Sequence, residues 1–86
     1  MYLHIGGEYQ IALNYIIAIY DLDEITREDN EISLEFLANI EANNFLDIVS
    51  PELPKSLILT FDRAYLSPIS TVALRDRIRN IYRNYN

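Results

Sequence analysis

The segment that decides the fold is PKSLILTFDRAYLSP, residues 54–68. Its part 57–61 is a nearly continuous run of apolar and β-branched residues, which is typical of a strand buried on both faces. The polar pair at 62–63 predicts a tight turn, and residues 64–66 then have the pattern of a returning strand. The segment therefore predicts a hairpin at the centre of a β-sheet.

The chain before this hairpin has the pattern of further strands. Residues 2–5 and 8–13 flank Gly6-Gly7, and two glycines between strand-like runs predict a tight hairpin because the turn needs positive φ angles. Asn14-Tyr15 interrupts the pattern, as a short helical kink or as a bulge between strands. The apolar segment 16–22 is then expected to form the next strand.

Two helices are expected. Residues 26–29 (Thr-Arg-Glu-Asp) have the spacing of a capping box and predict a helix over about 27–43, which Asn43-Asn44 would end. A short strand at 45–49 follows. Ser70 or Thr71 can cap a final helix that extends through about Tyr82. The apolar stripe of this last helix consists of Leu74, Ile78, Ile81 and Tyr85.

These elements predict a single α+β domain, residues 1–86, with a small, mostly antiparallel sheet of five to six strands and two helices. A chain of 86 residues without cysteine buries only a modest fraction of its surface and has no disulfide. Its seven tyrosines suit interfaces, because each combines a large apolar ring with a polar tip. We therefore expect the domain to assemble into an oligomer.

The location of the protein is inferred from what its sequence does not contain. The chain has no cysteine for disulfides and begins without a basic, apolar leader, so no signal peptide is expected. No apolar run approaches the length that spans a bilayer. The sequence therefore predicts a cytoplasmic protein that does not bind membranes.

Charge is divided unevenly along the chain. Residues 1–53 hold eleven acids and one base, a net charge of −10, whereas residues 54–86 hold six bases and two acids, a net charge of +4. Such asymmetry can mark a polyanion-binding region or a contact between complementary subunits. The overall charge of −6 means that nucleic-acid binding would need a localised basic face.

Few residues suggest chemistry. His4, the only histidine, has no cysteine or second histidine to complete a metal site, so we expect a hydrogen-bonded strand residue. The acidic residues Asp21, Asp23 and Glu24 lack the glycine-punctuated loop of a calcium site and are expected in a solvated turn. No nucleophile is paired with a base. The sequence predicts no enzyme, no catalytic residue, no metal and no cofactor.

The final helix carries an arginine stripe at Arg75, Arg79 and Arg83, with Arg77 elsewhere on its circumference. Guanidinium groups bind phosphates with a fork of donors, so the stripe is a candidate DNA-binding surface. Two alternatives remain open. The arginines can be a solvated face that favours the helix macrodipole, or they can contact the acidic half of a neighbouring subunit.

Four segments form a further pattern: MYLHIG at 1–6, IIAIYD at 16–21, PKSLILT at 54–60 and YLSPIS at 65–70. Their order and spacing resemble the RemA/RemB family of bacterial extracellular-matrix regulators, and the RemB branch most closely. The resemblance covers most of the chain. It implies a cytoplasmic DNA-binding regulator of biofilm-matrix genes. It also implies that copies of the chain assemble into rings, because RemA members form rings that contact DNA at repeated basic positions.

The chain also departs from the RemA pattern. The basic run expected before the central strand is here Glu52-Leu53-Pro54-Lys55, in which only Lys55 is basic. Asn14 is followed by Tyr15, where RemA-type proteins carry an arginine. DNA binding is therefore either relocated or lost. If it is relocated, the expected contacts are Lys55, Arg75, Arg79 and Arg83.

Two hypotheses about function follow. In the first, the protein is an oligomeric DNA-binding transcription regulator of matrix genes, whose partners are double-stranded DNA, further copies of the chain and a RemA-like protein. Repeated weak contacts in a ring would give avidity and strong salt dependence. In the second, it is a non-DNA-binding structural or interaction protein, in which the acidic and basic halves of neighbouring subunits meet.

Overall fold

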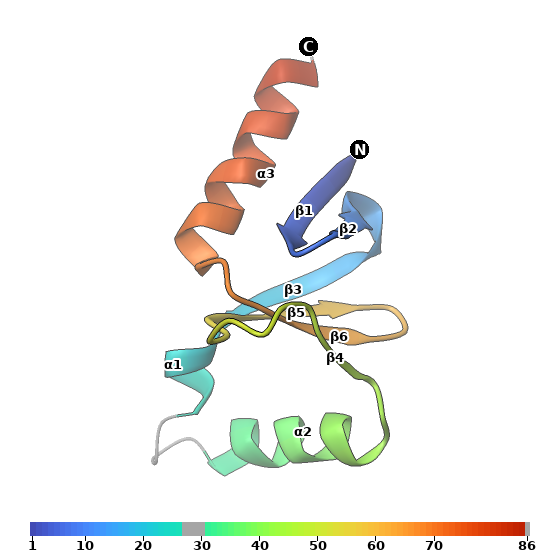
Figure 1. Ribbon diagram of the computed structural model, residues 1–86, viewed down its shortest axis with the longest axis vertical. Helices are drawn as coiled ribbons and strands as arrows, with labels where there is room; N and C mark the ends of the chain where they lie inside the picture. The colour runs from blue at the N-terminus through green and yellow to red at the C-terminus, as the bar shows by residue number, and fades with distance from the viewer. Residues whose placement is uncertain (27–30, 86) are drawn as a thin grey trace.

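The computed structural model describes residues 1–26 and 31–85, and the side chains of residues 1–26 and 34–84. These residues form six strands, three α-helices and one 3₁₀ helix (Figure 1). In chain order the elements are β1 (Tyr2–Gly6), β2 (Tyr9–Ala12), the 3₁₀ helix (Leu13–Tyr15), β3 (Ile16–Asp21), α1 (Leu22–Ile25), α2 (Glu31–Ala42), β4 (Leu46–Ile48), β5 (Ser56–Thr60), β6 (Ala64–Ser67) and α3 (Thr71–Tyr85).

The predicted central hairpin is confirmed. β5 and β6 are the two inner strands of a four-stranded sheet with the order β3-β5-β6-β4. Leu57 and Ile58 are fully buried, because neighbouring residues of β5 point to opposite, covered faces of the sheet. The loop between the strands is closed by Thr60, whose amide donates to the carbonyl oxygen of Arg63 at 2.8 Å.

The two faces of this sheet hold separate hydrophobic clusters. On one face Ile58 packs with Leu74 of α3 and with Leu3 and Ile5 of β1. On the other face Leu57 and Ala64 pack with Ile25 and Ile40, which belong to α1 and α2. Figure 1 shows this layering, with α3 and the β1–β2 hairpin on one side of the sheet and α2 on the other. The predicted α+β class is confirmed.

The N-terminal hairpin is confirmed, but it forms a sheet of its own rather than part of one sheet. The turn is also one residue later than predicted, because Gly6 still belongs to β1 and residues 7–8 connect the strands. Gly6 has a φ of 115° and Gly7 a φ of 54°, and both angles favour glycine. A Cβ atom on Gly7 would lie 2.8 Å from the carbonyl oxygen of Val49, so the close approach also requires glycine.

The sheet differs from the prediction in one pairing. β4 runs parallel to β6, whereas β3 with β5 and β5 with β6 pair antiparallel. A parallel pair needs a long connection, and here the chain between β4 and β6 first forms β5. The interruption predicted at Asn14-Tyr15 is the 3₁₀ helix Leu13–Tyr15.

The prediction of two helices was incomplete, because the described residues contain a third helix, α1. Asp21, the last residue of β3, caps α1 by accepting a hydrogen bond from the Asp23 amide at 2.9 Å. Asp23 and Glu24 therefore lie in a helix rather than in the predicted turn. Thr26 ends α1, since its hydroxyl donates to the carbonyl oxygen of Leu22. The predicted capping box at 26–29 lies mostly outside the described residues. Asn44, with a φ of 59°, follows the end of α2 as expected.

The C-terminal helix begins where the sequence predicted. The hydroxyl oxygen of Ser70 accepts a hydrogen bond from the amide of Ala73 at 3.2 Å, which is the geometry of an N-cap. Leu74 is fully buried, and Ile78 and Ile81 pack against the same cluster. In the described part of the chain, no helix has both the length and the apolar character needed to cross a bilayer.

Candidate functional site

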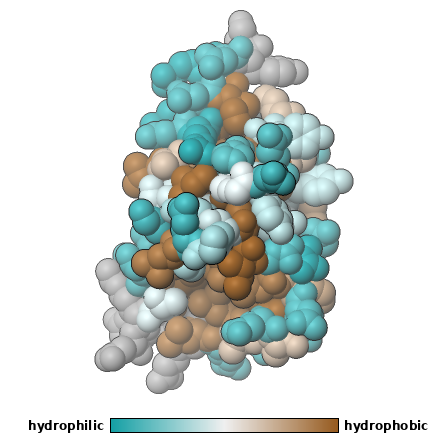
Figure 2. All heavy atoms as spheres, viewed as in Figure 1, coloured by the Kyte–Doolittle hydropathy of each residue, from teal (hydrophilic) through white to brown (hydrophobic). Residues whose placement is uncertain are grey.

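The arginine stripe lies on α3, the helix that extends away from the sheet toward the C-terminus (Figure 1). Arg75, Arg79 and Arg83 are all exposed, because they lie away from the side that carries Leu74. Hydrophilic residues gather over this part of the molecule, while hydrophobic residues are more frequent over the sheet (Figure 2). The three guanidinium groups therefore occupy successive turns of a solvent-facing helix.

The arginines of the stripe form few interactions with other described side chains. Arg79 lies 3.8 Å from a carboxylate oxygen of Asp76, and both side chains are about 60% exposed. Such an ion pair contributes little, because water and salt screen it. Arg75 and Arg83 have no ionic or hydrogen-bonded partner in the part of the chain that the structure describes. The stripe is thus free to bind an anion.

Arg77 has a different role from its neighbours. One of its terminal nitrogens donates to the carbonyl oxygen of His4 at 3.0 Å and lies 3.2 Å from the Nδ1 atom of His4. The Nε2 atom of His4 lies 3.0 Å from the carbonyl oxygen of Gly7. Because a carbonyl only accepts, Nε2 carries the proton and Nδ1 accepts from Arg77. His4 and Arg77 therefore join β1 to α3.

Lys55 lies near the beginning of α3, since it borders a hollow that Thr71 also lines. Its backbone joins three elements, since its amide donates to Ser67 at 2.8 Å and its carbonyl oxygen accepts from Leu22 at 3.0 Å. Its side chain borders a hollow of about 280 Å³ together with Asp21 and Asp23. Two nearby carboxylates reduce the attraction of this ammonium group for phosphate. Lys55 therefore differs from the arginines of the stripe in having two carboxylates beside it.

Arg63 is the most strongly bound cation. It makes a fork of hydrogen bonds to Asp47, at 2.9 Å from Nε and 2.7 Å from the terminal nitrogen, and also donates to the carbonyl oxygen of Asn44. The hydrogen bond to Asp47 raises the pKa of Arg63. Burial, then the charges of Asp62 and Asp47, raise the pKa of the adjacent Tyr65. The guanidinium group of Arg63 therefore joins β4 to the β5–β6 loop and is not available for a ligand.

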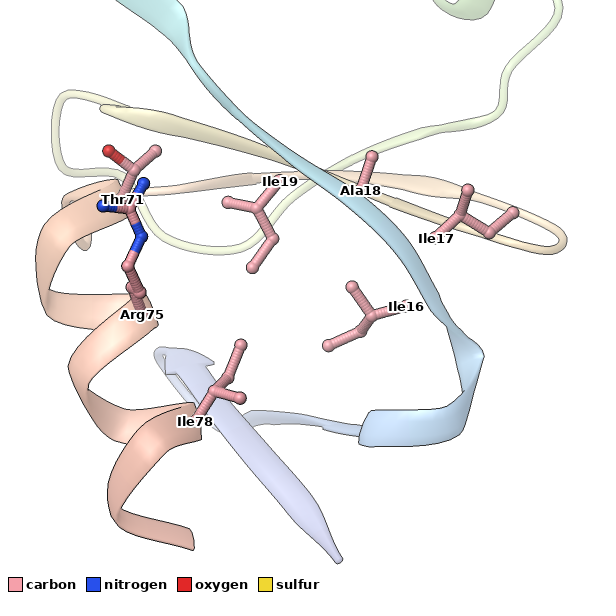
Figure 3. Close-up of a pocket in the computed structure, with 7 residues that line it drawn as sticks. All are labelled: Ile16, Ile17, Ala18, Ile19, Thr71, Arg75 and Ile78. Carbon is pink, nitrogen blue, oxygen red and sulfur yellow. The ribbon is translucent and has the colours of Figure 1, made fainter. Parts of the chain in front are cut away.

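A hollow of about 330 Å³ opens between β3 and α3 (Figure 3). Ile16 and Ile19 from β3 and Ile78 from α3 point toward one another across it, whereas Ile17 and Ala18 point away. Arg75 and Thr71 complete the lining. The hollow combines an apolar wall with an unpaired cation at the free edge of the sheet.

Large apolar side chains are also exposed on the edge strands β3 and β4, on α2, and in the segments that precede β3 and β4 and connect β5 to β6. They include Tyr15, Ile17, Phe36, Phe45, Ile48 and Phe61. Phe36, Phe45 and Phe61 border one hollow, and the ring of Tyr15 lies 6.0 Å from that of Phe61. Exposed apolar groups that lie together in this way are typical of protein contacts. Among the described residues no cluster of histidine, cysteine, aspartate or glutamate could hold a metal ion.

Comparisons with known proteins add no identification. No protein-family model matches the chain, and no curated protein matches it in sequence. The RemA/RemB resemblance therefore stays a prediction from the four segments described above. Sequence reasoning found the stripe on α3, but it did not find the His4–Arg77 bond or the hollow beside β3, because both depend on contacts between distant segments.

Proposed function

We propose that the protein is a cytoplasmic, oligomeric DNA-binding regulator of extracellular-matrix genes, as the RemA/RemB resemblance implies. One observation carries the proposal: three exposed arginines follow one another along the solvent-facing side of α3. Guanidinium groups bind phosphate oxygens through paired N–H donors. The stripe is therefore the surface that would contact the DNA backbone.

The expected mode of binding is contact with phosphates rather than reading of bases. The chain carries a net charge of −6, so a single copy binds DNA weakly, and several copies in one assembly supply the affinity through avidity. Contacts with phosphates position a protein on the duplex without selecting a sequence. Target selection would then depend on the spacing of the copies or on a RemA-like partner.

A salt series tests the proposal. Binding of the full chain to fluorescent duplex DNA is measured by anisotropy at increasing salt, for the native protein and for Arg79→Gln and Arg83→Gln. Each variant should weaken binding and reduce the salt slope by about one. Lys55→Gln is the matched control, and its effect should be smaller because Asp21 and Asp23 lie beside Lys55. Absence of binding to any duplex at low salt would overturn the proposal.

The exposed apolar side chains favour a second candidate, a non-DNA-binding oligomeric interaction protein. In this case the arginines meet the acidic residues of neighbouring subunits instead of phosphates. Replacing Arg75, Arg79 and Arg83 together by glutamate should then dissociate the oligomer. Light scattering measures this directly, and an unchanged mass would count against this candidate.

A further inference from the structure

We propose that the hollow between β3 and α3 binds a small aliphatic carboxylate, whose chain contacts the isoleucines and whose head group is held by Arg75. The proposal goes beyond the proposed function, because the ligand is a small acid rather than DNA. It assigns Arg75 to this site and leaves Arg79 and Arg83 as the exposed cations of the stripe. Binding in the hollow requires neither DNA nor a second copy of the chain.

The apolar wall of the hollow depends on a bulge in β3. In the pairing with β5, Ile19 lies opposite Ile58. The register shifts just after Ile16, which lies opposite Thr60. Side chains three residues apart in a regular strand point to opposite faces, but the extra residue of a bulge shifts this alternation. Ile16 and Ile19 therefore point into the same hollow, toward Ile78 of α3 (Figure 3).

The wall is only partly covered by the protein itself. Ile16, Ile19 and Ile78 pack against the core cluster of the α3 face, yet each is only half-buried. The hollow has a volume of about 330 Å³, at the lower end of the range for small-molecule sites. The described residues that line it include no aromatic side chain. An aliphatic chain therefore fits this wall better than a planar ring, which would need an aromatic partner to stack on.

One end of the hollow carries a cation. Arg75 extends along α3 to Thr71, at the end of the hollow where Ile19 lies (Figure 3). It is the only charged residue among the described residues that line the hollow, and it has no ionic or hydrogen-bonded partner among them or elsewhere in the described chain. A guanidinium group offers paired N–H donors that match the two oxygens of a carboxylate. A single unpaired cation therefore fits a ligand with one negative charge.

The neighbouring charges limit what the head group can contribute. Thr71 also borders the next hollow, where Lys55 lies with Asp21 and Asp23. These two carboxylates reduce the attraction of Arg75 for an anion. A small anion without a chain is therefore held weakly, and burial of the aliphatic chain must supply much of the affinity.

A second apolar hollow provides an internal comparison. Phe36, Phe45 and Phe61 border a hollow of about 440 Å³, which is the larger of the two. Its lining also includes an arginine, Arg63, but that guanidinium group is already bonded to Asp47 at 2.7 Å. An aliphatic acid that only sought apolar surface would bind at the phenylalanines. An acid selected by its charge binds beside Arg75 instead.

Titration of the full chain with octanoate tests the site, followed through backbone amide shifts in two-dimensional NMR spectra. The shifts should saturate with one ligand per chain and be largest in residues 16–19 and 71–78. Octanamide has the same shape without the charge, and it should bind about tenfold more weakly or worse. Acetate keeps the head group, and its affinity should be lower by up to about fourfold for each methylene removed. Equal binding of octanoate and octanamide, or shifts centred on α2, would overturn the proposal.

Two arginine variants test which cation holds the head group. Arg75→Gln should weaken octanoate binding by about tenfold or more and leave octanamide binding unchanged. Arg83→Gln is the matched control, because Arg83 is exposed on the same helix but does not line the hollow, and it should leave both unchanged. Urea denaturation checks that both variants fold as the native chain does. Octanoate binding that survives Arg75→Gln in a folded protein would overturn the proposal.

A third variant tests the influence of the neighbouring hollow. Asp21→Asn keeps a capping side chain for α1 and removes one of the two nearby negative charges, so octanoate should bind more tightly. No DNA is present in any of these titrations, so their outcome is independent of the proposed function. Binding of octanoate without binding of duplex DNA would overturn only the proposed function, and the reverse result would overturn only this proposal.

Discussion

The two faces of the four-stranded sheet are covered in different ways. On the α3 face, two elements cover the sheet. Leu3, Ile5, Ile58 and Leu74 have no exposed surface there, and the other two members of the cluster, Ile11 and Val49, are 7% exposed. On the α2 face, the cluster is completed by Ile25 and Ile40, which are 8% and 9% exposed. Phe36 and Phe45 beside them are about half exposed. Leu57 is fully buried on this face too, so the two faces differ mainly in the phenylalanines that the second face leaves exposed beside its cluster.

Polar bonds strengthen this difference. On the α3 face the hydroxyl of Ser67 donates to the carbonyl oxygen of Ile5 at 2.6 Å, and that of Ser56 donates to Ile69 at 2.7 Å. Arg77 adds the link to His4. These bonds satisfy buried polar groups and fix the positions of β1 and α3. We therefore expect side chains on the α3 face to contribute more to the free energy of unfolding, and α2 to shift more easily than α3.

The largest expected difference is in core packing. Leu74→Ala should lower the free energy of unfolding by about 4 kcal/mol, because it leaves a cavity in a closed core. Ile40→Ala should cost about 2 kcal/mol, because solvent already reaches that side chain and α2 can shift toward the gap. Urea denaturation at equal protein concentration measures both. Equal costs for the two variants would contradict the comparison.

A smaller effect is expected from the buried serine. Ser67→Ala leaves the carbonyl oxygen of Ile5 without the hydroxyl that donates to it, which should cost about 1–2 kcal/mol. Ser50→Ala is the matched control, because the Ser50 hydroxyl oxygen accepts only an exposed bond from Glu52 at 3.2 Å. Its cost should be within about 0.5 kcal/mol of zero. The same urea series compares them, and a neutral Ser67→Ala would show that the bond does not secure β1.

Arg77 and Arg83 provide a comparison within one helix. Arg77→Gln should lower the free energy of unfolding by about 1 kcal/mol, because the charged hydrogen bond to His4 is lost. It should also speed hydrogen exchange in β1 and β2. Arg83→Gln should change neither measurement, since Arg83 has no partner among the described residues. If Arg83→Gln had the larger effect on stability, the two roles would be reversed.

The smallest expected effect is on how the free energy of unfolding depends on pH. Burial of Tyr65, followed by the charges of Asp62 and Asp47, raises the pKa of its phenol above the ordinary value of 10.0. The folded protein therefore retains this proton to a higher pH than the unfolded chain. The resulting stability is fully present below pH 10 and is lost as the pH rises through the raised pKa.

Denaturation between pH 9 and 11, roughly one unit on either side of the tyrosine pKa, measures this loss. Tyr65→Phe should show a shallower decline than the native chain, whereas Tyr82→Phe, at an exposed position, should follow the native curve. Identical curves for all three proteins would show that Tyr65 is not the responsible group.

Local sequence patterns predicted most elements of this fold. The run 57–61, the Gly6-Gly7 pair and the apolar stripe of α3 each reflect interactions within a few residues, which a single sequence displays directly. α1 was missed because four residues are too few to show helical periodicity. The parallel pairing of β4 with β6 was missed because hydrophobic pattern does not specify the direction of a neighbouring strand.

The sequence predicted part of the candidate site, because helical spacing is also a local pattern. Spacing alone placed Arg75, Arg79 and Arg83 on one side of a helix. It did not separate Arg77 from them, because the partner of Arg77 is His4, 73 residues away in sequence. Likewise Lys55 was grouped with the arginines by charge, although folding places it beside Asp21 and Asp23.

The tight approach of Gly7 to Val49 has a consequence for recognising relatives of this protein. A side chain at position 7 would meet the backbone of Val49 at 2.8 Å, so divergent sequences that keep this fold must keep a glycine there. Position 6 is equally restricted by its φ of 115°. Most surface positions have no such constraint and can drift until overall similarity is lost. A glycine pair at this distance before a buried SLILT-like strand is thus a more durable marker of common ancestry than overall sequence identity.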